Sequence, residues 1–222
     1  MRFAGGVTKR ANSVLPLAPA VEDGAAVLGW IEQVERAYRA RGLPPRFQIS
    51  AACWPPGLPQ LLLERGYVQH DRTLVLAAPL RPVETTWSVE LAAEPSETWF
   101  DAWWAIDGRG GAEEATVARR ILDRIEPACA FASCVDAEGV AAIGLGLVDE
   151  DWLGVYCMGT QPRARRRGCA RSVLGRLGTW ALEHGAQHAY LLVAEANEPA
   201  LALYRSLGFT EAGRYVYFTL SE

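Results

Sequence analysis

A short basic segment around Gly168 constrains this chain more than any other feature. Residues 152–160, WLGVYCMGT, contain enough β-branched and aromatic residues to predict a strand. From Gly168 onward, apolar residues recur at helical spacing until Gly185, a typical C-terminal stop. The order is therefore strand, basic loop, helix. Main-chain N–H groups in such a loop and at the start of a helix form a concave site for an anion such as a diphosphate.

The positive charge of the protein is local, because its formal net charge is -4. Arginines cluster around the loop at Arg163, Arg165, Arg166, Arg167 and Arg171. A single basic spot on an acidic protein suits a small phosphorylated molecule. A nucleic acid would need a wider basic face, so no nucleic-acid partner is expected.

The composition indicates no membrane span, secretory signal or metal site. No stretch approaches the roughly 20 apolar residues that a membrane span requires, and the start has no long apolar segment, so a cytoplasmic protein without a membrane partner is expected. Cys129 and Cys134 are spaced neither as a zinc pair nor as a redox dithiol. His184 and His188 are separated by Gly185, where the helix should end, which argues against a two-histidine metal face.

A second pattern follows the expected helix. Residues His188–Ala194 form a short, continuously apolar run, as expected of a central strand covered on both faces. Asn197 is a good N-cap and Pro199 is tolerated in the first turn of a helix that ends before Gly208. A last strand is expected at Tyr215–Leu220.

Further elements are expected upstream. Strands are predicted at 87–92, 130–135 and 140–148, with helices at 96–106 and 113–125. The order from residue 87 onward is then β, α, α, β, β, β, α, β, α, β. This order predicts a mixed α/β fold.

Two motifs together resemble those of the GNAT (GCN5-related) N-acetyltransferases. Residues Arg165–Ala170, RRRGCA, are similar to the acetyl-CoA signature, in which Arg or Gln, two residues, Gly, any residue, then Gly or Ala follow a strand and open a helix. The second family hallmark is matched by Asn197, Ala200, Leu203-Tyr204 and Gly208-Phe209. The resemblance implies a GNAT acyl-CoA N-acyltransferase fold with a mixed sheet. It also implies an enzyme that transfers the acetyl group of acetyl-CoA directly to a primary amine.

The resemblance also implies the cofactor-binding residues. By position they are Met158, Thr160, Arg165, Arg166, Arg167, Gly168, Cys169, Ala170, Asn197 and Tyr204. Main-chain groups near Met158 would bind the pantetheine arm and face the thioester carbonyl. Tyr204 would be the general acid that protonates the departing thiolate, the alternative being a helix aromatic packed on the last strand. Asn197 would contact the pantetheine amides, the alternative being a plain N-cap.

The general base is the least defined part of the site. Glu195, where the central strand ends, is the candidate, and the acidic turn 149–151 or a water relay are alternatives. A family base often lies on the strand 152–160, but Tyr156 and Cys157 stand there instead of a carboxylate. Aromatic residues of the helix 96–106 either wall the acceptor pocket or form ordinary core: Trp99, Phe100, Trp103 and Trp104.

The first 81 residues look like a faded copy of the end of the chain. Gly66-Tyr67 aligns with Gly208-Phe209, and Leu62 then stands where Tyr204 does. The segment Pro19–Gly24 replaces the basic loop. Residues 1–81 are therefore interpreted as a degenerate, structural GNAT-like half, and 82–222 as the catalytic GNAT domain, the alternative being a chance match.

This organisation resembles the tandem GNAT proteins that include the mycothiol synthases. The acceptor stays open between a small-molecule amine and a peptide or lysine amine, and so do the native start of the chain and the oligomeric state, homodimers being common in the family. Two rival functions also remain at this point: transfer of a larger acyl group from CoA, and a CoA-binding regulatory module without turnover.

Overall fold

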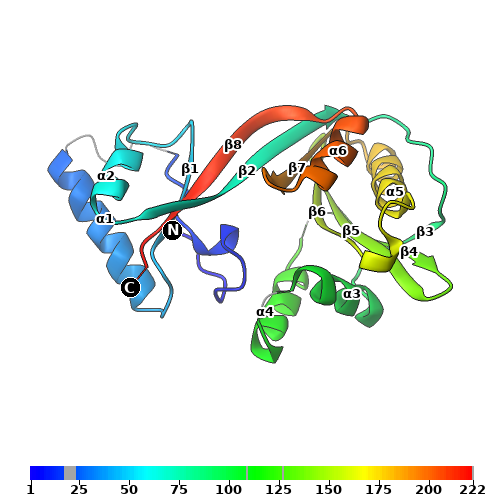
Figure 1. The fold of residues 1–222 in the computed structure, drawn as a ribbon, viewed down its shortest axis with the longest axis horizontal. Helices are drawn as coiled ribbons and strands as arrows, with labels where there is room; N and C mark the ends of the chain where they lie inside the picture. The colour runs from blue at the N-terminus through cyan, green and yellow to red at the C-terminus, as the bar shows by residue number, and fades with distance from the viewer. Residues whose placement is uncertain (18–23, 109, 127, 222) are drawn as a thin grey trace. The chain divides into compact units, whose positions relative to one another are not determined.

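The computed structural model describes residues 1–17, 24–108, 110–126 and 128–221 (Figure 1). Its α-helices are α1 (Gly24–Arg39), α2 (Leu58–Glu64), α3 (Glu97–Asp107), α4 (Ala112–Leu122), α5 (Cys169–Glu183) and α6 (Glu198–Ser206). Its strands are β1 (Arg46–Ser50), β2 (Val68–Pro79), β3 (Val89–Ala92), β4 (Ala128–Asp136), β5 (Gly139–Asp149), β6 (Trp152–Thr160), β7 (His188–Ala194) and β8 (Thr210–Thr219). No helix of these residues is long and apolar enough to cross a membrane.

The strands are hydrogen-bonded in the order β1-β8-β2-β7-β6-β5-β4-β3. Strand β6 pairs parallel with β7, whereas β3 to β6 pair antiparallel in sequence. The mixed α/β fold and the order of elements expected from residue 87 onward are therefore confirmed.

The chain forms two compact units. The N-terminal unit contains residues 1–74, 194–196 and 213–222, and the C-terminal unit contains 75–193 and 197–212. Strands β2 and β8 each supply residues to both units. The interpretation of residues 1–81 as a degenerate GNAT half stays a prediction.

The N-terminal unit has its own core. Helix α1 presents Val27, Ile31, Val34 and Tyr38, spaced by three or four residues, to the apolar side chains of β1 and α2. In the sheet, β1 pairs antiparallel with β8, so that Phe47 lies opposite Phe218. The last part of the chain thereby completes the core built by its first part.

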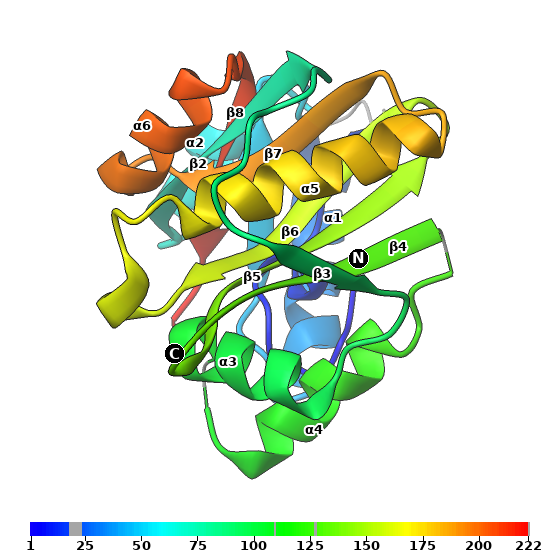
Figure 2. The same ribbon diagram turned by 90° about the vertical axis from the view of Figure 1, so that its right-hand side faces the viewer.

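The C-terminal unit is a sheet covered on both faces. Helix α5 crosses one face and α3 lies against the other, with α4 following α3 on the same side (Figure 2). Helix α5 lies directly over β5 because Gly144 has no side chain there. A Cβ at that position would come within 2.8 Å of Val173. This close packing sets the position of the N-terminus of α5.

Several element ends differ from the sequence-based expectation, among them one each in β3, α4 and β8. The strand expected at 87–92 begins at Val89, because the main-chain N–H of Trp87 donates to Ser172 Oγ at 3.2 Å and not to the sheet. The helix expected at 113–125 ends at Leu122, after which i to i−3 hydrogen bonds tighten the chain. Strand β8 begins at Thr210, before the expected Tyr215. Its first residues are largely exposed and carry no apolar signal, so the sequence pattern did not reveal this start.

Candidate active site

The N-terminus of α5 has no side-chain cap. Its N-cap is Gly168, in the left-handed region at φ 87°, which has no side chain to accept from the first turn. By contrast, Ser96 caps α3 and Asn197 caps α6 through side-chain oxygens. Arg166 is also left-handed, at φ 61°. Alternating conformations of this kind turn successive amides to one side, which leaves the free N–H groups of α5 available to an external anion.

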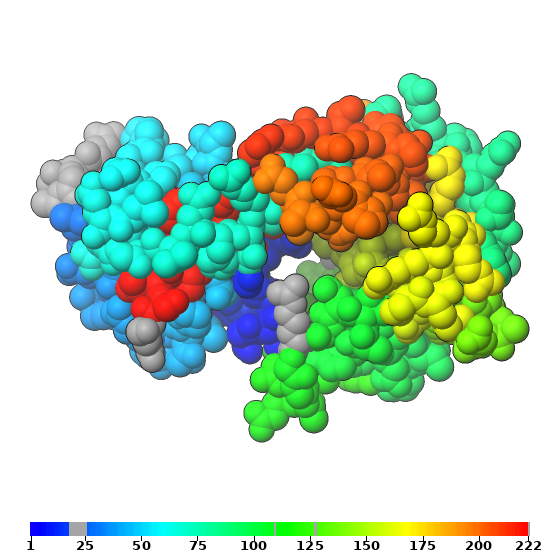
Figure 3. Space-filling view, in the orientation of Figure 1, coloured from blue at the N-terminus to red at the C-terminus, as the bar shows by residue number. Residues whose placement is uncertain are grey.

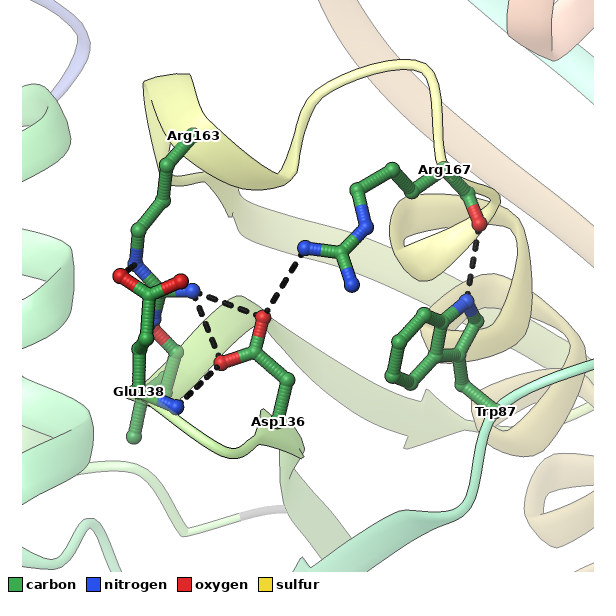
Figure 4. Close-up of polar contacts among 6 residues, drawn as sticks. Trp87, Asp136, Glu138, Arg163 and Arg167 are labelled. Atoms are coloured by element: carbon green, nitrogen blue, oxygen red, sulfur yellow. Dashed lines mark hydrogen bonds and ion pairs between the residues drawn. The ribbon is translucent and has the colours of Figure 1, made fainter.

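The arginines of this loop fall into two groups. Arg163 and Arg167 form ion pairs with Asp136 (Figure 4). Arg165 and Arg166 are exposed, and no ion pair is found for them within the described part of the chain. The start of α5 also lies beside α6 on the surface (Figure 3), and Arg171 donates to Ser206 Oγ at 3.3 Å. The guanidinium groups of Arg165 and Arg166 are therefore accessible to an anionic ligand.

Strands β6 and β7 are paired over only part of their length. Their parallel register runs from Trp152 opposite His188 to Val155 opposite Leu191 and ends there. Strand β6 continues to Thr160 without β7 beside it in the ladder. An unpaired strand edge accepts an extended ligand as an additional strand. The part of β6 after Val155, which precedes the loop before α5, is therefore without β7 as a ladder partner.

A β-bulge interrupts β6 at the same place. The register between β5 and β6 shifts between Ile143 and Leu145, and Cys157 takes φ 49°. Bulges turn main-chain groups out of the ladder and occur next to active sites. The Met158 side chain lies over Gly144 on the α5 face, where a Cβ would come within 2.6 Å of its sulfur. Main-chain groups next to Met158 therefore lie on the part of β6 that β7 does not pair with, and their role in cofactor binding stays a prediction.

Tyr204 is a buried phenol on α6. Its side chain is 7% exposed, and its ring packs edge-on to Phe209 with centroids 6.0 Å apart. Burial raises the pKa of Tyr204 to about 12. The phenol is therefore neutral throughout the physiological range and can act as a proton donor.

Comparison with known proteins decides the family. The family model described as "Probable histone acetyltransferase Rv0428c C-terminal" matches residues 1–218. The chain belongs to this family. The expected resemblance to GNAT N-acetyltransferases is confirmed, and the protein is an acyltransferase of the GNAT type. The more specific likeness to mycothiol synthases stays a prediction.

Individual relatives span most of the chain. It is 28% identical over 223 residues to "Uncharacterized N-acetyltransferase YobR" of Bacillus subtilis, covering 98% of this chain and 87% of that protein. A GCN5-related N-acetyltransferase from Kribbella flavida is 23% identical, with a TM-score of 0.66 over 90% of this chain and 77% of that one. A tandem GNAT protein from the clavulanic acid biosynthesis pathway is 14% identical, with a TM-score of 0.68 over 90% and 70%. At these identities the solved structures share the fold.

Two further residues predicted for the GNAT site lie at the end of β7. Asn197 Oδ1 accepts from the main-chain N–H of Ala200 at 3.3 Å, so the N-cap is present, and its contact with pantetheine stays a prediction. The carboxylate of Glu195 lies between two guanidinium groups, 3.8 Å from Arg72 and 3.7 Å from Arg214. Its role as the base stays a prediction, although this setting is that of an ion pair.

The alternative acids lie elsewhere along β6. The turn 149–151 precedes Trp152, and the main-chain carbonyl of Asp151 accepts from Gln187 and His188. The bulge at Cys157 is six residues further along, which is about 20 Å at the rise of a strand. The acidic turn and the bulge are therefore well separated along β6.

The aromatic residues of α3 divide into two pairs. Trp99 and Phe100 are 1% and 2% exposed, and Trp99 Nε1 donates to the carbonyl of Ala132 at 3.0 Å. These two are core residues. Trp103 and Trp104 are partly exposed and remain candidates for the wall of an acceptor pocket.

Sequence reasoning missed two parts of this region. Asp136 holds the loop arginines, yet nothing local distinguishes it from the other acidic residues, because its partners lie in the loop that precedes α5. The hydroxyls of Tyr156 and Tyr190 are hydrogen-bonded at 2.5 Å on β6 and β7. The only sequence signal for this pair was that each of the two apolar strands carries a tyrosine.

Proposed function

We propose that this GNAT protein transfers the acetyl group of acetyl-CoA directly to a primary amine. The observation that carries the proposal is the uncapped N-terminus of α5, where Arg166 and Gly168 are left-handed, next to the parted strands β6 and β7. Free main-chain amides and exposed guanidiniums fit a diphosphate. The unpaired edge of β6 fits the amide-containing pantetheine arm.

Each predicted cofactor residue has a defined part in this proposal. The amides of Gly168, Cys169 and Ala170 receive the diphosphate, with Arg165 and Arg166 beside it. Cys169 is 1% exposed, so it contributes its main chain and not its thiol. Arg167 likewise contributes its main chain, because its side chain pairs with Asp136. Met158 and Thr160 would bind the pantetheine amides along β6.

The chemistry then follows from two groups of this chain. As the amine attacks the thioester, negative charge develops on the carbonyl oxygen, and a main-chain N–H near Met158 would stabilise it. The departing thiolate then needs a proton, which Tyr204 would donate. A phenol with a pKa of about 12 is a weaker acid than a thiol of pKa about 8.5, so its proton moves only when the sulfur is within hydrogen-bonding distance. Position, not acidity, makes Tyr204 suitable.

The acceptor side of the reaction requires a base. The amine must lose a proton before attack, and Glu195 or a water relay would take it. The acceptor is a small-molecule or peptide amine, without nucleic acid or membrane as a partner. A cytoplasmic location and a homodimer remain predictions.

Tyr204→Phe tests the proposal. Acetyl-CoA would be offered with a panel of amines, and thiol release would be recorded. The variant should lower kcat by about 100-fold or more, because general acid catalysis contributes at least that much. Its Kd for CoA, measured by calorimetry, should stay within twofold of wild type. Tyr38→Phe is the control, since it removes a buried hydroxyl that donates to the Arg2 carbonyl in the N-terminal unit.

The possible results separate the rival functions. A wild-type protein that binds CoA and releases no thiol with any amine would be a regulatory module. Faster turnover with a longer acyl-CoA would indicate the larger acyl donor. Unchanged kcat in Tyr204→Phe would remove Tyr204 from the mechanism.

A further inference from the structure

Asp136, at the end of β4, binds two arginines of the loop that precedes α5 (Figure 4). Its two oxygens accept from Arg163 Nη1 at 2.8 and 2.7 Å, and Oδ2 also accepts from Arg167 Nη1 at 3.3 Å. Oδ1 accepts in addition from the main-chain N–H of Glu138 at 3.0 Å. The side chain is 6% exposed. The hydrogen bonds from Arg163 are the main reason that the pKa of this carboxyl lies below its ordinary value.

The positions of the two arginines matter more than their number. Arg163 and Arg167 bracket Arg165 and Arg166, so one carboxylate holds both ends of the loop. A single carboxylate with charge-assisted hydrogen bonds to both ends restricts the conformations of the residues between them. Those residues include the left-handed Arg166.

A second set of contacts holds the loop from the other side. Trp87 Nε1 donates to the main-chain carbonyl of Arg167 at 2.8 Å, and the guanidinium of Arg167 lies 5.0 Å from the centre of the Trp87 ring. The main-chain N–H groups of Thr86 and Trp87 donate to the hydroxyl of Ser172 in the first turn of α5. The segment before β3, the loop and the helix N-terminus are thereby joined.

We propose that Asp136 is a positioning residue for the diphosphate of acetyl-CoA. By pairing with Arg163 and Arg167 it holds the loop amides in the orientation that receives the diphosphate, and it leaves Arg165 and Arg166 for direct contact with phosphate oxygens. This inference rests on the proposed function. Asp136 itself touches no substrate, because its oxygens are occupied by the loop.

Electrostatics alone predicts the opposite sign for the loss of Asp136. A carboxylate near a phosphate site repels the ligand, so its neutralisation should strengthen CoA binding. Loss of positioning should weaken binding, because part of the binding free energy would then be used to order the loop. The direction of the change in Kd therefore separates the two roles.

The experiment compares Asp136→Asn with Glu138→Gln. Each removes one negative charge from the same turn, but Glu138 is 69% exposed and its carboxylate lies 3.8 Å from Arg163 Nε. By calorimetry, Asp136→Asn should raise the Kd for CoA about tenfold, and Glu138→Gln should leave it unchanged or slightly lower. Acetyl-pantetheine, which has no diphosphate, gives the second readout. With this donor kcat/KM should be the same in Asp136→Asn and wild type, which a general loss of structure would not allow.

Trp87→Phe keeps the proposal testable if Asp136→Asn does not fold. It removes the hydrogen bond to the Arg167 carbonyl without a change of charge, and it should raise the Kd for CoA about threefold. Asp136→Asn that binds CoA as tightly as wild type, or more tightly, would overturn the inference while leaving the proposed function intact. Equal losses with acetyl-CoA and acetyl-pantetheine would also overturn it. A wild-type protein that takes up no CoA would end the proposed function itself.

Discussion

Two regions of this molecule share the same order of helices and strands, and only one of them contains the proposed site. The first runs through α1, β1, α2 and β2, and the second through α5, β7, α6 and β8. Strands β1 and β7 begin at Arg46 and His188, helices α2 and α6 end at Glu64 and Ser206, and strands β2 and β8 begin at Val68 and Thr210. Each pair is 142 residues apart. Equal spacing is what a copy would retain, and the interpretation of the first region as a copy of the second stays a prediction.

The turn after the shorter helix is the same in both regions. Gly66 and Gly208 have φ 84° and 86°. The main-chain N–H of Tyr67 donates to the Leu62 carbonyl at 3.0 Å, and that of Phe209 to the Tyr204 carbonyl at 3.1 Å. This left-handed stop ends a helix and starts a strand through purely local chemistry.

The two regions differ where the second is proposed to bind and react. Leu62, 0% exposed, stands in the place of Tyr204. The strand that precedes α5 is represented before α1 by a single parallel bridge between Val14 and Phe47. The expected replacement of the basic loop by Pro19–Gly24 falls mostly on 18–23, outside the described residues. The comparison teaches that the apolar pattern and the helix stops are common to both regions, while the loop and the side chain of the proposed site are found in one of them.

Of the substitutions that test this comparison, Gly168→Ala should have the largest effect, which is on the Kd for CoA. The substitution forces alanine into φ 87° and brings its Cβ within 3.2 Å of Thr86 Oγ1. A left-handed conformation costs about 1–2 kcal/mol for a residue with a Cβ, so the Kd for CoA should rise about tenfold as the loop changes shape. Gly42→Ala, at φ 65° in open space after α1, is the control and should leave CoA binding unchanged. Equal Kd values for both variants would refute the special role of the loop.

Alanine at the two matched helix stops should have a smaller effect, on stability in both variants and on kcat in only one. Gly66→Ala and Gly208→Ala introduce the same strain, so each should lower the free energy of unfolding by about 1 kcal/mol, or a few degrees in Tm. Only Gly208→Ala should also lower kcat, because Gly208 ends the helix that positions Tyr204. Thermal unfolding and steady-state kinetics measure the two parts. A loss of kcat in Gly66→Ala of the same size would show that the regions are not functionally distinct.

The pH dependence of kcat should show the smallest effect. Burial raises the pKa of Tyr204 to about 12, so the phenol stays protonated well above pH 10 and should not cause a fall in kcat between pH 8 and 10. An exposed tyrosine, with a pKa of about 10, would already be half ionised at the upper end. A decline centred near pH 10 in the wild type would show that the phenol is not buried during turnover.

Much of the site was predictable because its signals are local. The strand before the loop and the central strand have the predicted ends, and Asn197 and Gly208 cap and stop α6 as predicted. A cap or stop depends on a few neighbouring residues and on allowed φ values. Apolar periodicity likewise reports which face of an element is buried, whatever it packs against.

Pairings between distant residues were not predictable in this way. The ion pairs of Asp136 with the loop, those of Glu195 with Arg72 and Arg214, and the end of the β6–β7 register at Val155 all join segments far apart in the chain. Such contacts have no local pattern.

The sequence by itself determined the order of elements from residue 87 onward, the basic loop before α5 and the position of Tyr204 on α6, since each depends on neighbouring residues. Only the tertiary structure decided which carboxylate holds the loop, where the strands part and which aromatic residues of α3 are core. Those outcomes depend on how separate elements pack and pair, and the free energies involved belong to the folded chain as a whole.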